Sequence, residues 1–200
     1  MGEHYYTENP TSESRPAEAV FAYRGHELQL TTDSGVFSRG ELDAGTRILL
    51  AALPEALPGS ILDLGCGWGP VGLSVGLENP DSDITFSDIN LRALELAKKN
   101  AEKYGIRGTF IHSDGFAEIE GSFDAIITNP PIRAGKQTIY QMFADSAERL
   151  TPGGALYLVI RKQQGAPSAQ KYLATLFPKV EILDKSGGYW VFRCVKEADK

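Results

Sequence analysis

Short apolar runs alternate with segments of helical periodicity along most of this chain. From Leu42 onward, runs of four to seven apolar and β-branched residues are separated by stretches in which apolar residues recur every three or four positions. This alternation is typical of a parallel sheet whose strands are joined by helices. It predicts seven strands, at residues 61–64, 84–87, 109–112, 125–128, 155–160, 180–183 and 189–195.

Three segments carry apolar residues at helical spacing, and we expect these helices to cover the faces of the sheet. Asn90 precedes the second segment, where its side chain can cap the first turn. The apolar positions are Ile48, Leu49 and Leu53 in the first segment, Leu91, Leu94 and Ala97 in the second, and Tyr140, Phe143, Ala147 and Leu150 in the third.

The two ends of the chain depart from this alternation. The last two strands are separated only by a short stretch around Gly187 and Gly188, which is too short for a helical crossover, so they must pair antiparallel. Near the start, residues 20–23 and 26–30 read as a hairpin around Arg24 and Gly25, and residues 33–35 as another turn. We therefore predict an N-terminal extension over residues 1–40 and a single main domain over residues 41–200.

Composition restricts the class of protein. The chain has 200 residues, of which 42% are hydrophobic and 23% charged, as expected for one globular α/β domain. It has no apolar run of the roughly 18 residues that a membrane span needs, and the polar residues 1–16 lack the apolar core of a secretory signal, so we expect a cytoplasmic protein without a membrane partner. Cys66, Cys194 and the three histidines show no metal-ligand spacing, so no metal site is expected. The net charge of −6 argues against indiscriminate binding to nucleic acid and requires any RNA contact to be local.

A glycine-rich turn follows the first core strand. Glycines there let the backbone approach a ligand closely, and the next helix presents unpaired N–H groups. The pattern G-x-G-x-x-G over residues 67–72 is also that of a dinucleotide binder, which leaves a dinucleotide oxidoreductase as an alternative. An acidic residue before the glycines and Pro70 after them instead favour a sulfonium-bearing amino acid. The predicted binding residues are Asp63, Gly65, Cys66, Gly67 and Gly69.

Two further strand ends carry acidic residues. Asp88, followed by Ile89, ends the second core strand, where its carboxylate can accept hydrogen bonds from both hydroxyls of a ribose. Its alternative role is to cap the next helix. After the third core strand, Asp114 can accept the exocyclic amine of an adenine while Gly115 and Phe116 lie against the ring, although a surface turn would also explain this segment. These residues should lie at one edge of the sheet.

Asn129, Pro130 and Pro131 end the fourth core strand and are the candidate catalytic residues. Two prolines make the backbone extended and rigid. The Asn129 side-chain oxygen and the Pro130 carbonyl can both accept from one NH₂ group and fix it for attack on a methyl group, while stabilising the positive charge that develops on nitrogen. The alternative is a strand that is simply ended by prolines.

These motifs together resemble the methyltransferase small domain family, which includes ribosomal RNA guanine-N2 methyltransferases. The resemblance covers residues 28–195 and includes Gly-Val-Phe-Ser at 35–38 and Leu-Asp-Ala-Gly-Thr at 42–46. It implies a Rossmann-like class I methyltransferase with a seven-stranded, mostly parallel sheet, a C-terminal antiparallel hairpin and helices on both faces. It further implies S-adenosyl-L-methionine as cofactor, S-adenosyl-L-homocysteine as product, and secondary cofactor contacts from Phe37, Ser38 and Thr46.

The substrate is less specified than the reaction. Many relatives follow the prolines with an aromatic residue that stacks on the target ring, whereas this chain has Ile132, so Tyr189 or Trp190 would have to serve. The resemblance implies that guanine N2 is the methylated atom and that the partner is ribosomal RNA or a ribosomal subunit. Two other methylation targets remain open, adenine N6 and a protein glutamine amide. The chain could also be a noncatalytic cofactor- or RNA-binding module, and it could form a homodimer. The predicted basic rim around the substrate consists of Arg39, Arg133, Lys136, Arg161 and Lys162.

Overall fold

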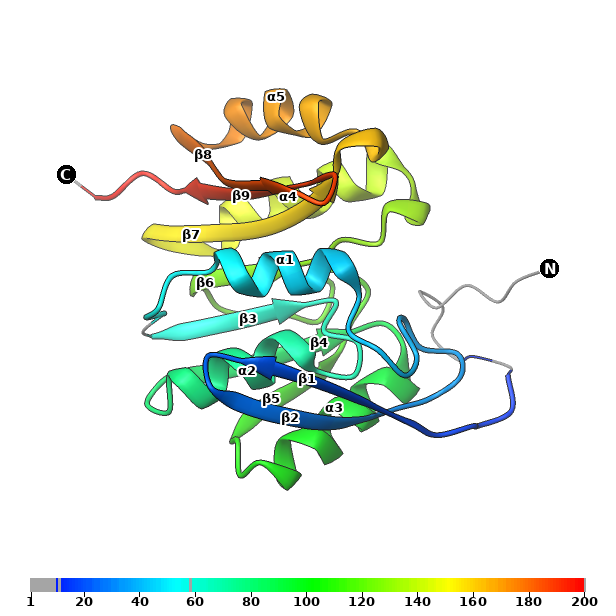
Figure 1. Cartoon of the computed structure of the whole chain (residues 1–200). Helices are drawn as coiled ribbons and strands as arrows, with labels where there is room; N and C mark the ends of the chain where they lie inside the picture. The colour runs from blue at the N-terminus through cyan, green and yellow to red at the C-terminus, as the bar shows by residue number, and fades with distance from the viewer. Residues whose placement is uncertain (1–9, 11, 58, 200) are drawn as a thin grey trace.

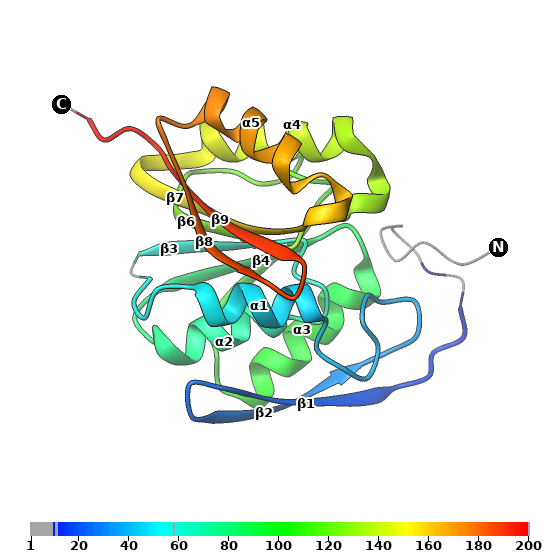
Figure 2. The same cartoon turned by 45° about the horizontal axis from the view of Figure 1, so that its top comes forward.

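The computed structural model describes residues 10, 12–57 and 59–199. A central sheet separates two layers of helices (Figures 1 and 2). The expectation of no secretory signal within residues 1–16 falls largely on residues outside this range. None of the helices in the described range has the length and apolar character that crossing a bilayer requires.

The central sheet has seven strands in the order β5-β4-β3-β6-β7-β9-β8. The chain runs outward from β3 to β5, returns to pair β6 on the other side of β3, and ends with β9 antiparallel to both β7 and β8. The reversal makes a crevice between the carboxyl ends of β3 and β6, which is where ligands bind in open α/β sheets. The strands are β3 (Ser60–Leu64), β4 (Asp83–Asp88), β5 (Gly108–His112), β6 (Phe123–Thr128), β7 (Leu150–Arg161), β8 (Lys179–Ser186) and β9 (Tyr189–Val195).

Helices cover both faces of this sheet, because side chains alternate between the faces along each strand. Residues such as Ile61 and Ile127 face one hydrophobic cluster with the first three helices, and Leu62 and Ile126 face the other with the last two. The helices are α1 (Ala44–Ala52), α2 (Pro70–Glu78) and α3 (Leu91–Lys103) on the first face, and α4 (Lys136–Arg149) and α5 (Ala166–Leu176) on the second, with short 3-10 turns η1 (Ile132–Ala134) and η2 (Lys162–Gln164).

The start of the described chain forms a separate two-stranded antiparallel sheet, β1 (Ala17–Tyr23) and β2 (His26–Thr32), whose turn contains Arg24 and Gly25 at positive φ. Phe21, Leu28 and Leu30 of this hairpin are buried in the same hydrophobic cluster as α1, α2 and α3. The hairpin therefore packs on the helical layer that lies against the first face of the main sheet (Figure 2).

The predicted fold is confirmed, including the seven strands and the C-terminal antiparallel pair. The strands are mostly longer than the patterns predicted, while β9 has the predicted bounds. The placement of Leu150 in a helix was wrong, because α4 ends at Arg149 and Leu150 begins β7 with an extended backbone. Leu150 is 1% exposed and packs into the cluster beneath α4. Its burial fitted the helical spacing although its backbone is that of a strand.

Candidate active site

A cavity of about 910 Å³ lies at the carboxyl edge of the sheet. Its walls come from the loops after β3, β4, β5 and β6, the segment before α1, and one side of α4. This volume is within the range of cofactor and substrate pockets in proteins. The structure thus brings together residues that the sequence placed at four separate strand ends. Those that line the cavity are Asp63, Gly65, Cys66, Gly67, Asp88, Ile89, Asp114, Gly115, Phe116, Asn129, Pro130 and Pro131, together with Phe37, Ser38 and Thr46.

The glycine-rich loop after β3 leaves room for a ligand. Gly65 and Gly67 have φ of 72° and 57°, and a Cβ at either position would meet nothing within 4 Å. The backbone N–H groups of Gly65 and Cys66 donate to the Ser87 carbonyl, which ties the loop to β4. Both glycines are therefore free to lie against a bound molecule. Burial raises the pKa of the Cys66 thiol, which keeps that side chain neutral.

Gly69 has a different role from the other two glycines. It is buried, has φ of 90°, and does not line the cavity. A Cβ at this position would lie 2.3 Å from Cδ1 of Leu73 and 3.2 Å from Cβ of Ala97. Gly69 therefore allows α2 to start beside α3, and its predicted contact with the cofactor finds no counterpart among the residues that line the cavity.

Asp63 lies at the bottom of the cavity, under the glycine loop. Its side chain is buried, and Oδ2 accepts a hydrogen bond of 2.8 Å from the Gly72 backbone N–H. Burial raises the pKa of Asp63 to about 7, the Gly72 hydrogen bond lowers it, and the Asp88 charge raises it further. A cationic ligand nearby would favour the ionised form of this carboxyl.

Asp88 is held by the backbone on both sides. Oδ2 accepts from Gly67 N and Oδ1 from Asn90 N, each at 2.8 Å. Burial raises the pKa of Asp88, against the lowering effect of these hydrogen bonds. Asn90 caps α3 through a bond from Ala93 N to its Oδ1, so the predicted cap is confirmed. Each Asp88 oxygen keeps a further lone pair for a hydroxyl donor.

One buried polar atom beside this site lacks a partner. Ser87 Oγ lines the cavity and is buried, and it makes no hydrogen bond to any residue that the structure describes. An unpaired buried hydroxyl costs free energy, so such an atom indicates a site that a polar molecule fills. The acidic and hydroxyl groups and the open glycines fit a ligand that carries an amino acid, a ribose and an adenine.

The loop after β5 forms a wall of the same cavity. Ser113 Oγ accepts from Glu118 N and donates to the Gly115 carbonyl, which closes the loop on itself. Phe116 is buried, whereas Asp114 is exposed at the cavity. The loop thus presents an apolar ring and a carboxylate side by side, as its proposed contact with an adenine requires.

Asn129 is fixed by two side chains from the segment that starts α1. Its Nδ2 donates to Asp43 Oδ2 at 3.1 Å and to Thr46 Oγ1 at 3.0 Å. Because a carboxylate only accepts hydrogen bonds, the NH₂ group of Asn129 must face Asp43. The amide oxygen is thereby left for another donor. No described residue donates to the Pro130 carbonyl, while the Pro131 carbonyl accepts from Ala134 N at 2.8 Å.

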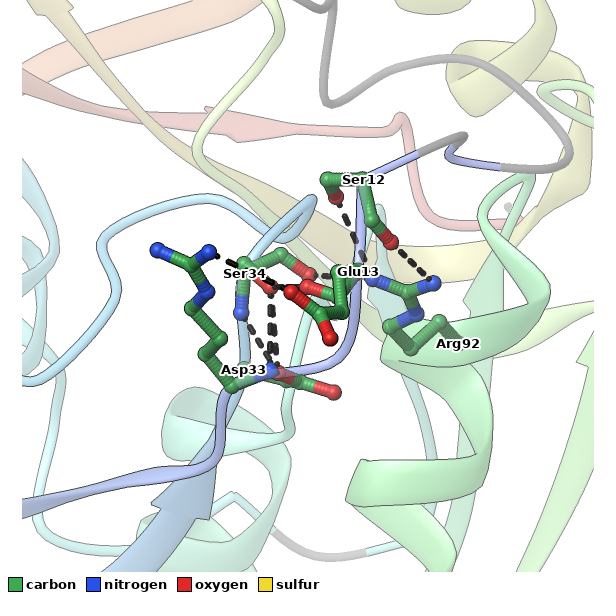
Figure 3. Close-up of polar contacts among 6 residues, drawn as sticks. Ser12, Glu13, Asp33, Ser34 and Arg92 are labelled. Carbon is green, nitrogen blue, oxygen red and sulfur yellow. Dashed lines mark hydrogen bonds and ion pairs between the residues drawn. The ribbon is translucent and has the colours of Figure 1, made fainter.

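The segment between β2 and α1 covers one side of the cavity with Phe37 and Ser38. It is held by donors from three places: Trp68 Nε1 to the Phe37 carbonyl at 2.9 Å, Asn90 Nδ2 to the Gly35 carbonyl at 2.8 Å, and Arg92 Nη1 to the Ser34 carbonyl at 2.7 Å. Arg92 Nη2 also donates to the Ser12 carbonyl, and Asp33 and Ser34 bind the chain near Glu13 (Figure 3). Asn90 and Arg92, at the start of α3, thus hold both Asp88 and the segment that covers the cavity.

The predicted basic rim does not line the cavity. All five cations are exposed, and two stand over aromatic rings, Lys136 over Tyr140 at 5.1 Å and Arg161 over Tyr189 at 5.8 Å. Ile132 is partly buried against the second hydrophobic cluster and lines a separate, smaller cavity of about 150 Å³. Arg39, Arg133 and Lys162 are likewise absent from the cavity walls. The role of these residues toward a substrate stays a prediction.

The two aromatic residues considered for stacking, Tyr189 and Trp190, pack against different hydrophobic clusters. Strand β9 begins with Tyr189 paired to Arg161, the last residue of β7, so it starts at the cavity edge of the sheet. Tyr189 faces α1, where a Cβ on Gly45 would lie 3.0 Å from its Cε1, whereas Trp190 packs against the second cluster with Lys185 over its ring. Neither ring lines the cavity.

Several residues of the cavity were missed from the sequence. Asp43 lies 86 positions from Asn129, so no local motif joins them. One side of α4 forms a wall, and its polar residues recur four positions apart, a signal that reads as solvent-exposed surface until the neighbouring loop is placed. The missed residues include Leu42, Asp43, Gln137, Thr138, Gln141, Met142, Asp145, Glu148 and Arg149. In the described ranges, no three His, Cys, Asp or Glu side chains converge in the way that a metal ion requires.

Comparison with known proteins supports the resemblance. The family model described as methyltransferase small domain matches residues 27–193. A Bacillus subtilis protein of uncharacterized function is 44% identical over 98% of this chain and its own full length. Ribosomal RNA small subunit methyltransferase C of Hahella chejuensis is 35% identical over 94% of this chain and 57% of its own.

A solved structure supports the same relationship at the level of the fold. The 16S ribosomal RNA guanine-N2 methyltransferase of T. thermophilus, in complex with S-adenosylmethionine and guanosine, superposes with a TM-score of 0.81 and 27% identity over 92% of this chain and 52% of its own. The chain therefore spans about half the length of the ribosomal RNA methyltransferases that it matches.

Proposed function

The chain belongs to the methyltransferase small domain family, and from that premise we propose that it is an S-adenosylmethionine-dependent methyltransferase acting on an exocyclic amine, guanine N2 in ribosomal RNA. The observation that carries this proposal is the orientation of Asn129, whose NH₂ group is bound by Asp43 and Thr46. Its oxygen is thus left to receive an amine in the same cavity as the glycine loop.

The cofactor would be held by the residues after β3, β4 and β5. The Gly65 and Gly67 backbone would lie against its amino acid part, Asp88 would accept from the ribose hydroxyls, and Asp114 and Phe116 would contact the adenine. Phe37, Ser38 and Thr46 would add contacts from the covering segment. When bound, S-adenosylmethionine supplies a methyl group on a positively charged sulfur.

The chain contributes positioning and electrostatics to the transfer. Asn129 Oδ1 and the Pro130 carbonyl each accept one hydrogen of the substrate amine, which directs the nitrogen lone pair into the cavity. The same two acceptors stabilise the positive charge on nitrogen until its proton is lost to water. Backbone rigidity at Pro130 and Pro131 keeps these acceptors in place. Methyl transfer assisted by these two acceptors needs no covalent bond between enzyme and substrate.

An RNA substrate is supported by the relatives, whose names specify ribosomal RNA. The exposed cations Arg39, Arg133, Lys136, Arg161 and Lys162 belong to segments around the carboxyl edge of the sheet and would contact phosphates beside the target. An enzyme acting on a base must take that base out of the stack, and the wide cavity offers room for it. An enzyme with this substrate would act in the cytoplasm.

The proposal is tested by transfer of labelled methyl from S-adenosylmethionine to separated cell fractions. The fractions are naked ribosomal RNA, small and large ribosomal subunits, and ribosome-free protein, prepared from cells that lack this enzyme. We expect label in RNA with the wild-type protein and none with Asn129→Ala, followed by mapping of the label to guanine N2.

Other results of this experiment contradict the proposal in defined ways. Label at adenine N6 would replace the target atom, and label only in protein would favour the glutamine amide. Bound S-adenosylhomocysteine without label in any fraction would indicate a binding module. Stabilisation by dinucleotides instead of S-adenosylhomocysteine in thermal melts would favour an oxidoreductase.

A further inference from the structure

Asp43 has a carboxylate oxygen to which the proposed reaction gives no role. It lines the cavity, it is half-buried, and it ends the covering segment immediately before α1. A single oxygen, Oδ2, accepts both from Thr46 N at 3.1 Å, which caps the helix, and from Asn129 Nδ2 at 3.1 Å. No residue in the described part of the chain donates to its other oxygen, Oδ1.

Two oxygens that accept from no described residue, Asp43 Oδ1 and Asn129 Oδ1, belong to side chains that are hydrogen-bonded to each other. Asn129 presents Oδ1 because its NH₂ group is bound by Asp43 and Thr46. Asp43 accepts both of its hydrogen bonds through Oδ2, so Oδ1 accepts from no described residue. Both residues line the same cavity, and the 3.1 Å bond between Asn129 Nδ2 and Asp43 Oδ2 keeps their remaining oxygens close together, so they offer a ligand two neighbouring acceptors from different parts of the chain.

Two adjacent acceptors match one kind of base edge. The Watson–Crick edge of guanine presents two neighbouring donors, the exocyclic amine N2 and the ring N1–H. Adenine presents an amine beside a ring nitrogen that carries a lone pair, which a carboxylate oxygen repels. A glutamine amide has no second donor on a neighbouring ring atom. The order of donors and acceptors therefore distinguishes the three substrate classes that share an NH₂ group.

We infer that Asp43 is a specificity-determining residue, whose free oxygen accepts the N1–H of the target guanine while Asn129 and Pro130 hold its N2 amine. This inference rests on the proposed function and narrows it. Asp43 also positions Asn129, but its contact with N1–H is a separate role of a separate oxygen. A site with an acceptor for N1–H discriminates strongly, because a base without that donor leaves a desolvated carboxylate unpaired.

The substitution Asp43→Asn separates the two roles. Its amide oxygen can take the place of Oδ2 and keep both the helix cap and the bond to Asn129, since asparagine also caps helices well. Its NH₂ group then replaces the free oxygen and turns an acceptor into a donor. The matched control is Glu41→Gln, which makes the same change of charge two residues earlier at an exposed side chain outside the cavity walls.

The assay compares methyl transfer to two versions of the substrate RNA, one with guanine at the target and one with 2-aminopurine. The analogue keeps the exocyclic amine but has an unprotonated ring N1, which accepts a hydrogen bond. We expect the wild-type protein and Glu41→Gln to prefer guanine in kcat/KM by at least about tenfold, as one charge-assisted hydrogen bond would give. Asp43→Asn is expected to reverse the preference toward 2-aminopurine.

A second variant covers the case in which Asp43→Asn perturbs the fold. Asp43→Ser keeps a capping oxygen and removes the cavity-facing one, so the preference should fall toward equality without reversal. Equal losses on both RNAs in both variants would overturn the inference and leave Asp43 a purely structural residue. An unchanged preference would overturn it as well. Wild-type label confined to protein would overturn this inference and the proposed function together, whereas an unchanged preference leaves the proposed function standing.

Discussion

The two halves of the cavity are built in different ways. In the glycine-loop half, made of residues 63–72 with Asp88, carboxylates accept hydrogen bonds from backbone N–H groups 9 and 21 positions away. In the amide half, made of Asn129, Asp43 and Thr46, side chains bind one another across 83 and 86 positions. Backbone N–H groups hold the carboxylates of the first half in place, whereas the second half depends on the identity of three side chains.

This difference separates binding from chemistry. Backbone groups hold Asp63 and Asp88 whatever occupies the amide half, so we expect the cofactor site to survive substitutions there. The amide half has no such support, because each bond disappears with one side chain. Substitutions in the two halves should therefore change different measured quantities, the dissociation constant of the cofactor in one case and the turnover number in the other.

The largest effect is expected from Asn129→Ala. Loss of the amide oxygen removes an acceptor aimed at charge that develops during transfer, which lowers turnover by about 10²- to 10³-fold. The dissociation constant of S-adenosylhomocysteine, measured by calorimetry, should stay within about twofold, since the glycine-loop half is untouched. Turnover within tenfold of the wild-type value would contradict the separation of the two halves.

The next effect concerns pH and the glycine-loop half. Because the folded protein raises the pKa of Asp63 to about 7, this carboxyl stays protonated in the folded state while it ionises in the unfolded chain. Its contribution to stability is thus present below about pH 4 and is lost as pH rises through about 7. Asp63→Asn removes this dependence and should flatten the fall in unfolding free energy between pH 5 and pH 8 by about 3 kcal/mol.

Urea unfolding at each pH measures this effect. Asp83→Asn is the matched control, since Asp83 is exposed at the start of β4 and should leave the pH profile as in the wild-type protein. The same slope in Asp63→Asn and in the wild type would show that Asp63 is ionised in the folded state.

A smaller effect is expected from Asp88→Asn. The amide keeps one acceptor for a backbone N–H but replaces one carboxylate oxygen that would receive a ribose hydroxyl. Loss of a hydrogen bond to a charged group raises the dissociation constant of S-adenosylhomocysteine by about tenfold. Turnover at saturating cofactor should change little. A variant that binds the cofactor normally but turns over slowly would reverse the roles given to the two halves.

The smallest effect is expected from Thr46→Val. The substitution keeps the shape and removes one of the two acceptors of Asn129 Nδ2, while Asp43 remains. A neutral hydrogen bond is worth about 1 kcal/mol, so turnover should fall by roughly fivefold, and cofactor affinity should fall by less because Thr46 is only a secondary contact of the cofactor. Thr109→Val, at an exposed position of β5, serves as control. An effect on cofactor affinity alone would mean that Thr46 belongs to the glycine-loop half.

The same contrast explains what the sequence could predict. Contiguous motifs predicted the glycine-loop half, because strand, turn and acid follow one another within a few residues, and Asn90 was predicted as a cap from its position alone. Asp43 was missed since its partner Asn129 is distant in sequence, and only the tertiary fold joins them. Gly69 was predicted as a contact because its spacing fits the motif, whereas packing against Leu73 determines it.

Periodicity had a similar limit at α4. The spacing of Tyr140, Phe143 and Ala147 predicted the helix, but an apolar residue at the same spacing, Leu150, already belongs to β7. Burial is common to both elements and does not distinguish them. The polar side of α4 lines the cavity together with the loop after β5, a tertiary arrangement that no pattern within the helix reveals.

The position of β9 has a consequence for synthesis of the protein. β9 (Tyr189–Val195) is made after every other strand of the sheet, yet it lies between β7 and β8 and pairs with both. While the chain grows on the ribosome, β7 therefore lacks its neighbour on that side and keeps an open edge. The sheet can be completed only after residue 195 has left the exit tunnel, so β7 and β8 lack their shared neighbour until then.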